Sequence, residues 1–303
     1  MRQPRCRARP ADRGSGALVT RLRLDRALVE RGLARSRTQA QDLIRSGRVL
    51  VDGSSEVRAS DLVEPGQQVS AEAEPWVSRA AYKLIGALDD LGLVPAGRAL
   101  DAGSSTGGFT QVLLARGCRQ VYAVDVGTDQ LDPRLRADPR VRVREQTSVR
   151  DLTLDHLEGD PVDLVVADVS FISLTLLLSR LAEVTAADGS WLLMVKPQFE
   201  VGRAALGRGG VVRDPDLQAR AVDGVCEAAA DLGWYAASVV PSRLPGPAGN
   251  REFFVHLSRD RRLAATARAQ RTVGSAAYAG AAGDQTVTEG PQDPGAPTSE
   301  ARP

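Results

Sequence analysis

Cysteine, histidine and lysine are scarce in this chain of 303 residues, which contains three, two and two of them respectively. The cysteines are scattered and odd in number, and they form no CxxC pair or Cys/His cluster. A disulfide framework and a metal site are therefore not expected. Free thiols fit a reducing, cytoplasmic environment.

Long apolar runs are missing as well. No uninterrupted apolar stretch approaches the ~18 residues that a membrane span requires, and the Arg- and Pro-rich N-terminus lacks the apolar core of a signal peptide. The sequence therefore predicts a cytoplasmic protein with no membrane span.

The net charge of +1 is unevenly distributed along the chain. Residues 1–48 contain 13 arginines and four acidic residues, a net charge of +9, so the remaining 255 residues carry −8. A basic N-terminal segment followed by an acidic remainder favours an anionic partner that binds at the N-terminal end. A solubilising tail is the alternative for residues 1–20, which show no periodicity and are expected to be disordered, as are the Ala- and Gly-rich residues 259–303.

Residues 21–73 have the pattern of a small α+β unit. Two short helices are expected to end near Gly32 and Gly47. Ser36 and Gln39 form a capping-box pattern in which Gln39 reaches back to the start of the second helix. Short β segments are expected at three places: Val49–Val51, around Val57 and near Val69.

Six arginines of this unit are expected to project away from its core. The guanidinium group is suited to bidentate phosphate contacts, although an ordinary solvated basic face is the alternative. The stretch reads RLDxxLxxxGLxxSRxxAxxLIxxGxVxVDG, and it resembles the αL RNA-binding module of the small ribosomal-subunit protein S-four family. The candidate RNA-binding residues are Arg23, Arg26, Arg35, Arg37, Arg45 and Arg48.

A glycine-rich turn lies between a short apolar run and an amphipathic stretch, in DAGSSTGGFT from Asp101 to Thr110. This is the strand–turn–helix pattern that opens a doubly wound sheet, and its glycines allow a ligand to approach the backbone closely. It matches neither GxxxxGK[ST] nor GxGxxG, so a nucleoside triphosphate loop is not expected.

Strand and helix patterns alternate from residue 98 to 257, which predicts a mostly parallel sheet covered on both faces. Strands after the glycine-rich turn are expected at Gln120–Asp125, Val141–Glu145, Val162–Asp168, Trp191–Val195, Tyr235–Val240 and Phe253–Leu257. Helices are expected at Arg79–Leu91, Leu174–Leu181 and Pro215–Leu232.

Three aspartates, Asp101, Asp125 and Asp168, stand at the carboxyl ends of expected strands and should surround one crevice. Asp125 ends the second strand, where a carboxylate accepts hydrogen bonds from the ribose hydroxyls of a nucleoside cofactor. Three carboxylates favour a cationic sulfonium, as in S-adenosylmethionine, over an anionic pyrophosphate. A nicotinamide-dependent oxidoreductase remains the alternative.

The only two lysines, Lys83 and Lys196, stand against 37 arginines. A desolvated lysine can reach a pKa of about 7–8 and accept a proton, whereas a guanidinium stays protonated. Lys196 directly follows the apolar run Trp191–Val195, at the carboxyl end of a strand. That position favours a chemical role over an ordinary surface lysine.

Lys83, Asp168, Lys196 and Glu252 occur in the contexts SRAAYKL, ADVSFISL, VKPQFE and NREFF. In chain order they match the Lys-Asp-Lys-Glu tetrad of FtsJ/RrmJ-like ribose 2′-O-methyltransferases. Together with the basic module and GRGGVVRDP, they make the chain similar to the TlyA (haemolysin A-like) family of rRNA methyltransferases. The resemblance implies a Rossmann-like fold with a mostly parallel seven-stranded sheet whose last strand is antiparallel, so that Glu252 meets the other three residues.

The resemblance further implies methyl transfer from S-adenosylmethionine to the ribose 2′-hydroxyl of cytidines in 16S or 23S ribosomal RNA, without a metal. Lys196 is the expected base or stabiliser of the alkoxide, Asp168 orients it, and Lys83 and Glu252 position the hydroxyl. The expected cofactor contacts are Asp101, Gly103, Ser105, Thr106, Gly107, Gly108, Phe109, Asp125, Val126 and Ser148.

The expected organisation is an RNA-binding domain over 21–73, a linker over 74–78 and a methyltransferase domain over 79–258. Arg203 and Arg208 lie in a glycine-rich loop that is expected to close over RNA, although its composition equally fits a mobile surface loop. The expected partner is ribosomal RNA or a ribosomal subunit, bound by a monomer. The alternatives are a membrane-active haemolysin and an RNA-binding assembly factor with an inactive methyltransferase fold.

Overall fold

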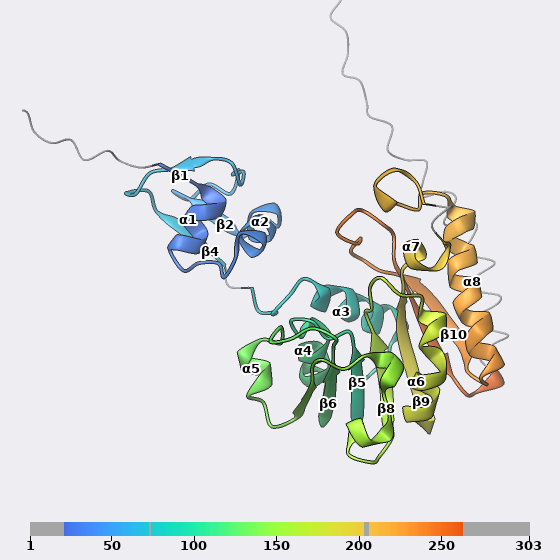
Figure 1. The fold of residues 1–303 in the computed structure, drawn as a ribbon. Coiled ribbons are helices and arrows are strands. Elements are labelled where there is room, and N and C mark those ends of the chain that lie inside the picture. Colours follow the sequence, from blue (N-terminus) through green and yellow to red (C-terminus); the bar gives the residue numbers. More distant parts are fainter. Residues whose placement is uncertain (1–20, 73, 203–205, 263–303) are drawn as a thin grey trace, which may run out of the picture. The chain divides into compact units, whose positions relative to one another are not determined.

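A computed structural model describes residues 21–72, 74–202 and 206–262, and the chain divides into two compact units between Pro75 and Trp76 (Figure 1). Residues 1–20 and most of the predicted C-terminal tail lie outside the described residues. Each unit has its own hydrophobic core.

The N-terminal unit consists of two short helices and two antiparallel pairs of short strands, β1 with β3 and β2 with β4. Leu24, Leu28 and Leu43 form the centre of its small core. Its elements are β1 (Leu22–Arg23), α1 (Leu24–Glu30), α2 (Arg37–Arg45), β2 (Val49–Val51), β3 (Leu62–Val63) and β4 (Val69–Ala71).

Two local expectations for this unit need correction. The β segment predicted around Val57 is wrong: the amide of Val57 donates to the carbonyl of Ser55 in a turn, and the strand lies at β3. One valine among polar residues offers too little apolar surface for a buried strand. Ser36 Oγ does accept from the amide of Gln39, at 3.2 Å, but the Gln39 side chain accepts from the amide of Arg35.

The C-terminal unit is a seven-stranded sheet with the order β10-β11-β9-β8-β5-β6-β7. The pairs from β9 to β7 are parallel, and β11 is antiparallel to both of its neighbours, as predicted for the last strand. Its strands are β5 (Arg98–Ala102), β6 (Gln120–Val124), β7 (Val141–Arg144), β8 (Val162–Ala167), β9 (Thr185–Val195), β10 (Tyr235–Pro241) and β11 (Phe253–Ser258). The chain order reverses between β5 and β8, and ligands of open α/β sheets bind outside the strand ends at such a point.

Helices cover both faces of this sheet, so its strands are apolar on both sides. α3 and α4 belong to one core cluster, and α6 and α8 to the other. The helices are α3 (Ala80–Leu91), α4 (Gly108–Ala115), α5 (Pro133–Arg136), α6 (Leu178–Val184), α7 (Pro197–Glu200) and α8 (Pro215–Asp231), with short 3₁₀ turns η1 (Val149–Asp151), η2 (Leu154–Leu157), η3 (Leu174–Leu176) and η5 (Arg208–Gly210). Among these described helices, none is both long and apolar enough to cross a membrane.

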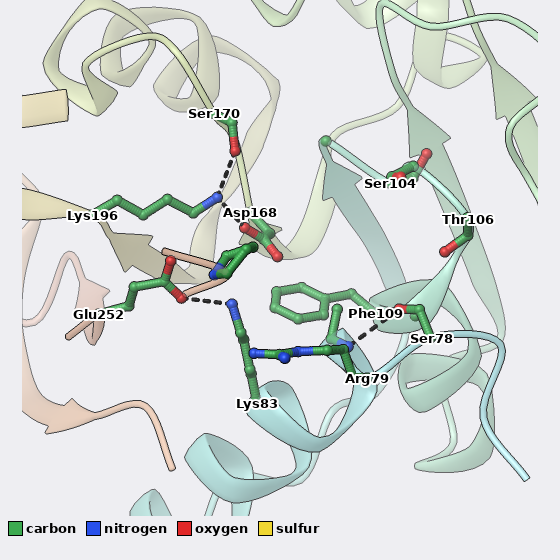
Figure 2. A pocket seen from close by; sticks show the side chains of 15 residues that line it. Ser78, Arg79, Lys83, Ser104, Thr106, Phe109, Asp168, Ser170, Lys196 and Glu252 are labelled. Atoms are coloured by element: carbon green, nitrogen blue, oxygen red, sulfur yellow. Dashed lines mark hydrogen bonds and ion pairs between the residues drawn. The ribbon is translucent and has the colours of Figure 1, made fainter. Parts of the chain in front are cut away.

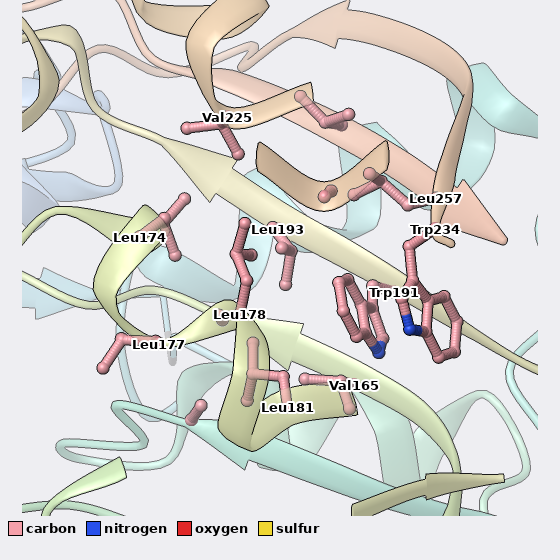
Figure 3. Close-up of a cluster of buried hydrophobic side chains, with 14 of the residues drawn as sticks. Val165, Leu174, Leu177, Leu178, Leu181, Trp191, Leu193, Val225, Trp234 and Leu257 are labelled. Atoms are coloured by element: carbon pink, nitrogen blue, oxygen red, sulfur yellow. The ribbon is translucent and has the colours of Figure 1, made fainter. Parts of the chain in front are cut away.

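Trp191 and Trp234 stack at the centre of the α6–α8 cluster, with ring centroids 4.0 Å apart (Figure 3). The indole N–H of Trp191 donates to Thr185 Oγ1 at 2.9 Å, which satisfies a polar group inside the apolar core. The same threonine lies at the start of β9, six residues before the predicted strand begins. The helix predicted at Leu174–Leu181 is divided into η3 and a later α6.

Candidate active site

The glycine-rich turn connects β5 to α4 at the carboxyl edge of the sheet. Gly103 and Gly107 have φ values of 86° and 94°, which favour glycine. A Cβ at Gly103 would lie 2.8 Å from the backbone oxygen of Asp168, and one at Gly108 would lie 2.5 Å from Ser78 Oγ. These glycines therefore let the turn pack against the ends of β8 and α3 and still expose its backbone.

A cavity of about 320 Å³ lies beside this turn, within the ~300–1,000 Å³ range of small-molecule sites. Gly103 to Thr106, together with Gly108 and Phe109, form one part of its wall. Lys83, Asp168, Lys196 and Glu252 form another part, with Ser170 beside them (Figure 2). The cavity thus joins the predicted cofactor loop to the predicted catalytic residues.

The four predicted catalytic residues form two ion pairs. Lys83 Nζ lies 2.6 Å from Glu252 Oε2, and both side chains are almost fully buried. Lys196 Nζ lies 2.6 Å from Asp168 Oδ1 and donates to Ser170 Oγ at 2.8 Å. Two buried lysines paired with two carboxylates at one cavity are an unusual concentration of charge, which is typical of a functional site.

Glu252 reaches this cavity because β11 runs antiparallel to β9. Phe253, the first residue of β11, pairs with Val195, the last residue of β9. Glu252 therefore lies at the same edge as Lys196, although 56 positions separate them in the sequence.

Asn250 holds the loop in front of Glu252. Its side chain is buried, and its Oδ1 accepts from the amide of Val212 at 2.9 Å while its Nδ2 donates to the carbonyl of Gly210 at 3.1 Å. It thus connects the glycine-rich segment that contains η5 to the start of β11. Asn250 was not predicted as a functional residue, because its only signal in the sequence is its place in the NREFF context.

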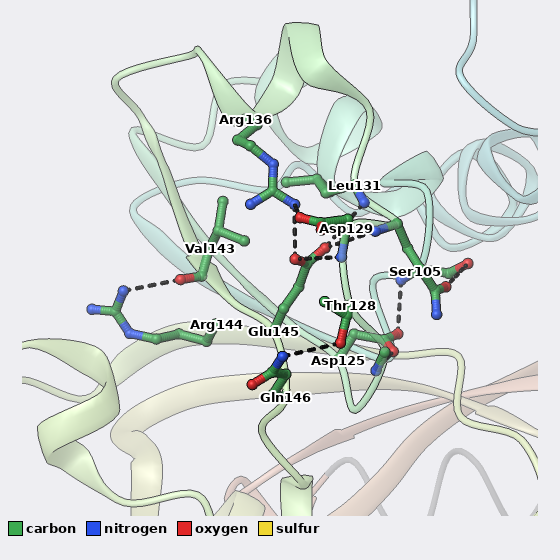
Figure 4. Close-up of polar contacts among 12 residues, drawn as sticks. Ser105, Asp125, Thr128, Asp129, Leu131, Arg136, Val143, Arg144, Glu145 and Gln146 are labelled. Carbon is green, nitrogen blue, oxygen red and sulfur yellow. Dashed lines mark hydrogen bonds and ion pairs between the residues drawn. The ribbon is translucent and has the colours of Figure 1, made fainter.

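Asp125 lies at the carboxyl end of β6 beside the glycine-rich turn (Figure 4). Its Oδ2 accepts from the amide of Ser105 at 2.8 Å and its Oδ1 from the amide of Gly127 at 2.7 Å. Both oxygens are fixed by the backbone, and each retains acceptor capacity for a ligand. Val126 follows with 71% of its surface exposed.

Glu145, which the sequence analysis did not assign to the site, organises the loop after Asp125. Its carboxylate accepts from the amides of Asp129, Gln130 and Leu131 and from Arg136 (Figure 4). Arg136 and these amides lower the pKa of Glu145 to about 2. The loop is therefore held by an anion throughout the neutral range.

Asp101 does not face the crevice as expected. It is fully buried beneath the glycine-rich turn, where its Oδ2 accepts from Thr110 Oγ1 at 2.6 Å. Its Oδ1 has no hydrogen-bond partner among the described residues. Asp101 therefore ties β5 to α4 from below. Ser148 is also used locally, because its Oγ accepts from the amide of Arg150 at the start of η1.

Burial raises the pKa of Asp101 to about 7, and the nearby charges of Asp168 and Asp125 act in the same direction. The folded state then holds a proton that the unfolded state releases above about pH 4, so stability falls as pH rises from 4 to 7. At about 1.4 kcal/mol per pKa unit, this group accounts for a decrease on the order of 4 kcal/mol.

Asp101→Asn is therefore expected to flatten the pH dependence of unfolding and to be more stable than the wild type at pH 8. All three tryptophans, Trp76, Trp191 and Trp234, lie in the C-terminal unit, so their fluorescence in urea titrations reports its unfolding. Parallel curves for the two proteins from pH 4 to 8 would show that Asp101 titrates normally.

Phe171 is a third residue that was not assigned to the site from the sequence. It follows Ser170, has 92% of its surface exposed, and adopts a φ of 66°, which is rare for a bulky residue. Its ring contacts that of Phe199, with centroids 5.4 Å apart. An exposed aromatic ring next to a partner of Lys196 offers a surface for a flat ligand.

The predicted RNA-binding arginines of the N-terminal unit are mostly ion-paired. Arg26 pairs with Glu30, Arg45 with Asp42, and Arg48 with Glu74. Arg23 and Arg37 both pair with Asp25, and Arg35 lies in the exposed turn before α2. In the glycine-rich loop, Arg208 begins η5 and Arg203 lies outside the described residues.

Comparisons with known proteins agree with this architecture. Residues 76–259 match the FtsJ-like methyltransferase family, and residues 22–69 match the S4 domain. The 16S/23S rRNA (cytidine-2′-O)-methyltransferase TlyA of Mycobacterium tuberculosis is 49% identical over 254 residues, which cover 82% of this chain and 94% of the relative.

More distant relatives also align with most of this chain. The 23S rRNA (cytidine-2′-O)-methyltransferase TlyA of Campylobacter jejuni is 32% identical, covering 75% of this chain and 96% of the relative. A solved structure described as a hemolysin from Streptococcus thermophilus is 33% identical, with a TM-score of 0.63, and covers 85% of this chain and 99% of its own.

Proposed function

The chain belongs to the FtsJ-like methyltransferase family, and we propose that it methylates the ribose 2′-hydroxyl of a cytidine in 16S or 23S ribosomal RNA. The observation that carries this proposal is the single cavity at which Lys83, Asp168, Lys196 and Glu252 meet beside the glycine-rich turn. The relatives that are rRNA 2′-O-methyltransferases support the substrate.

The residues present fit S-adenosylmethionine. Gly103 and Gly108 of the turn line the cavity, and Asp125 presents two fixed carboxylate oxygens to ribose hydroxyls. We assign the exposed Val126 to the adenine side of this site. When bound, the sulfonium supplies an electrophilic methyl group.

Lys196 is the residue that meets the ribose 2′-oxygen. Its ammonium group has three N–H bonds, of which one donates to Ser170 while the charge is paired with Asp168, so at least one remains for the substrate. As an ammonium it stabilises negative charge on the oxygen, and as an amine it accepts the hydroxyl proton. Asp168 fixes the direction of Nζ in either state.

Lys83 and Glu252 line the same cavity. Their buried pair offers a donor and an acceptor at fixed positions, which suits the orientation of one hydroxyl. The methyl-donor site is shaped by residues of the turn itself: Ser105, Thr106, Gly107 and Phe109. Asp101 and Ser148 support this site indirectly, Asp101 through its hydrogen bond with Thr110 and Ser148 by capping η1.

Asp125→Asn is expected to weaken S-adenosylhomocysteine binding roughly 10-fold or more, because a carboxylate with two hydrogen-bonded hydroxyls is lost. Asp129→Asn removes the same charge from the same loop at an exposed position and should leave the affinity within about twofold. Titration calorimetry measures both. Equal losses in the two variants would attribute the effect to charge alone.

Phe171→Ala is expected to lower methylation of ribosomal subunits roughly 10-fold, since stacking of a base on an aromatic ring is worth about 1–3 kcal/mol. The affinity for S-adenosylhomocysteine should not change. Leu176→Ala removes another exposed apolar side chain from the same segment and serves as the control. If both variants keep full activity on subunits, Phe171 does not contact the target nucleotide.

The alternatives have less support. A haemolysin function rests on the names of relatives, and an inactive assembly factor would have no need of the paired tetrad. The alternative of a nicotinamide-dependent oxidoreductase is wrong, because the chain belongs to a methyltransferase family. Because one chain supplies all four residues, we propose a monomer that acts on ribosomal subunits in the cytoplasm.

The test uses purified protein, S-adenosylmethionine labelled in its methyl group, and subunits from a strain that lacks the enzyme. Because a 2′-O-methyl group blocks alkaline cleavage, the label should appear in alkali-resistant dinucleotides that contain cytidine. Label in mononucleotides would place the methyl group on a base and contradict the proposal.

A further inference from the structure

Asp25 is a fully buried carboxylate in the N-terminal unit, and it binds side chains from two segments. Its Oδ1 accepts from Arg23 Nε at 3.2 Å, and its Oδ2 accepts from Arg37 at 3.0 Å and Gln41 at 3.1 Å. Arg23 donates a second bond to Oδ2 at 3.3 Å. One carboxylate thus joins the β1–α1 junction to α2.

The two arginines on Asp25 are not buried with it. The side chains of Arg23 and Arg37 are 48% and 62% exposed, whereas that of Asp25 is 0% exposed. Each guanidinium has five N–H donors in a planar fork, so the donors that do not reach Asp25 remain for solvent or a ligand. Because both arginines contact the same Oδ2, their guanidinium groups lie close together.

Two ion pairs on α1 and α2 are built differently. Arg26 and Arg45 pair with Glu30 and Asp42, acids that are themselves partly exposed. Exposed pairs are worth little and are easily exchanged for other partners. A buried acid that holds two exposed arginines fixes their direction, which lowers the entropy lost when they bind an anion.

We infer that Asp25 is a positioning residue that aligns Arg23 and Arg37 as a two-arginine clamp for a phosphate of the RNA backbone. The inference rests on the proposed function, because it concerns how the N-terminal unit holds the ribosomal RNA substrate. The buried acid reduces the net charge of the three residues to +1, but it holds both guanidinium groups where one phosphate can bind them.

The clamp makes a prediction opposite in sign to that of simple electrostatics. Asp25→Asn and Asp42→Asn each remove one negative charge, so each raises the net charge of the unit by one. By charge alone, both substitutions would strengthen RNA binding. The clamp instead predicts that Asp25→Asn weakens binding roughly 5- to 10-fold, because the arginines lose their charged anchor. Asp42→Asn should bind as well as the wild type or better.

Full-length proteins are tested by co-sedimentation with ribosomal subunits from a strain that lacks the enzyme, over a range of salt concentrations. A second pair of variants, Arg37→Gln and Arg45→Gln, removes one positive charge each from α2. The logarithm of the binding constant falls linearly with the logarithm of the salt concentration, and Arg37→Gln should reduce this slope by about one, as for a lost phosphate contact. Arg45→Gln should change the slope less. This pair decides the question if Asp25→Asn unfolds its unit, which limited proteolysis reports.

Equal effects within both pairs, or stronger binding of Asp25→Asn, would overturn the clamp while leaving the proposed methylation intact. A wild-type protein that does not sediment with subunits would overturn the clamp and the proposed function together. The loss in Arg37→Gln should appear as a raised KM for ribosomal subunits, because the clamp binds substrate and does not contact the reacting atoms.

Discussion

Lys196→Ala is expected to lower methyl transfer about 10²- to 10⁴-fold, the range for removal of a group that handles the proton of a reacting hydroxyl. The loss should appear in kcat, because Lys196, which contacts Asp168 and Ser170, is proposed to act on the reacting hydroxyl and not on the cofactor. The affinity for S-adenosylhomocysteine should stay within about threefold. Single-turnover assays on ribosomal subunits measure the chemical step directly.

Lys196→Arg separates the two roles open to this side chain. A guanidinium keeps the positive charge but does not accept a proton near neutral pH. If Lys196 acts as the base, Lys196→Arg should be as inactive as Lys196→Ala, and if it stabilises an alkoxide, the arginine variant should retain part of the activity. Full activity of the alanine variant in a folded protein would remove Lys196 from the mechanism.

Glu252→Ala is expected to destabilise the C-terminal unit by about 3–5 kcal/mol, because it leaves the buried ammonium of Lys83 without a counter-ion. Activity should fall with it, since we propose that the pair orients the substrate hydroxyl. The double variant Lys83→Met/Glu252→Leu replaces both charges with apolar groups, so it should recover most of the stability and none of the activity.

Tryptophan fluorescence during urea unfolding measures these stabilities, since all three tryptophans lie in this unit. Asp90→Ala, which breaks an exposed ion pair with Arg243, is the control and should change stability by less than about 1 kcal/mol. A double variant that regains methyl transfer would show that Lys83 and Glu252 are structural only.

The sheet was predictable from the sequence because its strands are buried on both faces and therefore read as short apolar runs. β6, β8 and β11 agree with the predicted ranges to within a residue. β9 begins earlier than predicted because Thr185 joins it through pairing with Val162, and a register shift separates that pair from the rest of the strand. Pairing between distant segments leaves no periodic signal in the sequence.

The four tetrad residues could be nominated from lysine scarcity and motif contexts, and the structure brings all four to one cavity. The sequence could not distinguish the buried Asp101 from Asp125, since both stand at the carboxyl ends of apolar strands. Only the fold shows that Asp101 lies buried beneath the glycine-rich turn. Asp25, Glu145 and Asn250 each act through contacts with loops or helices that local sequence patterns do not connect. Phe171 was overlooked because exposure is a property of the folded surface.

Nucleotide-resolution mapping of ribose methylation tests the central claim most directly. Ribosomal RNA is compared from a strain that lacks the gene and from the same strain carrying the wild-type gene or its Lys196→Ala variant. The proposed function predicts at least one cytidine 2′-O-methyl group that the wild-type gene restores and the variant does not. Identical methylation in all three strains, or a restored methyl group on a base, would contradict it.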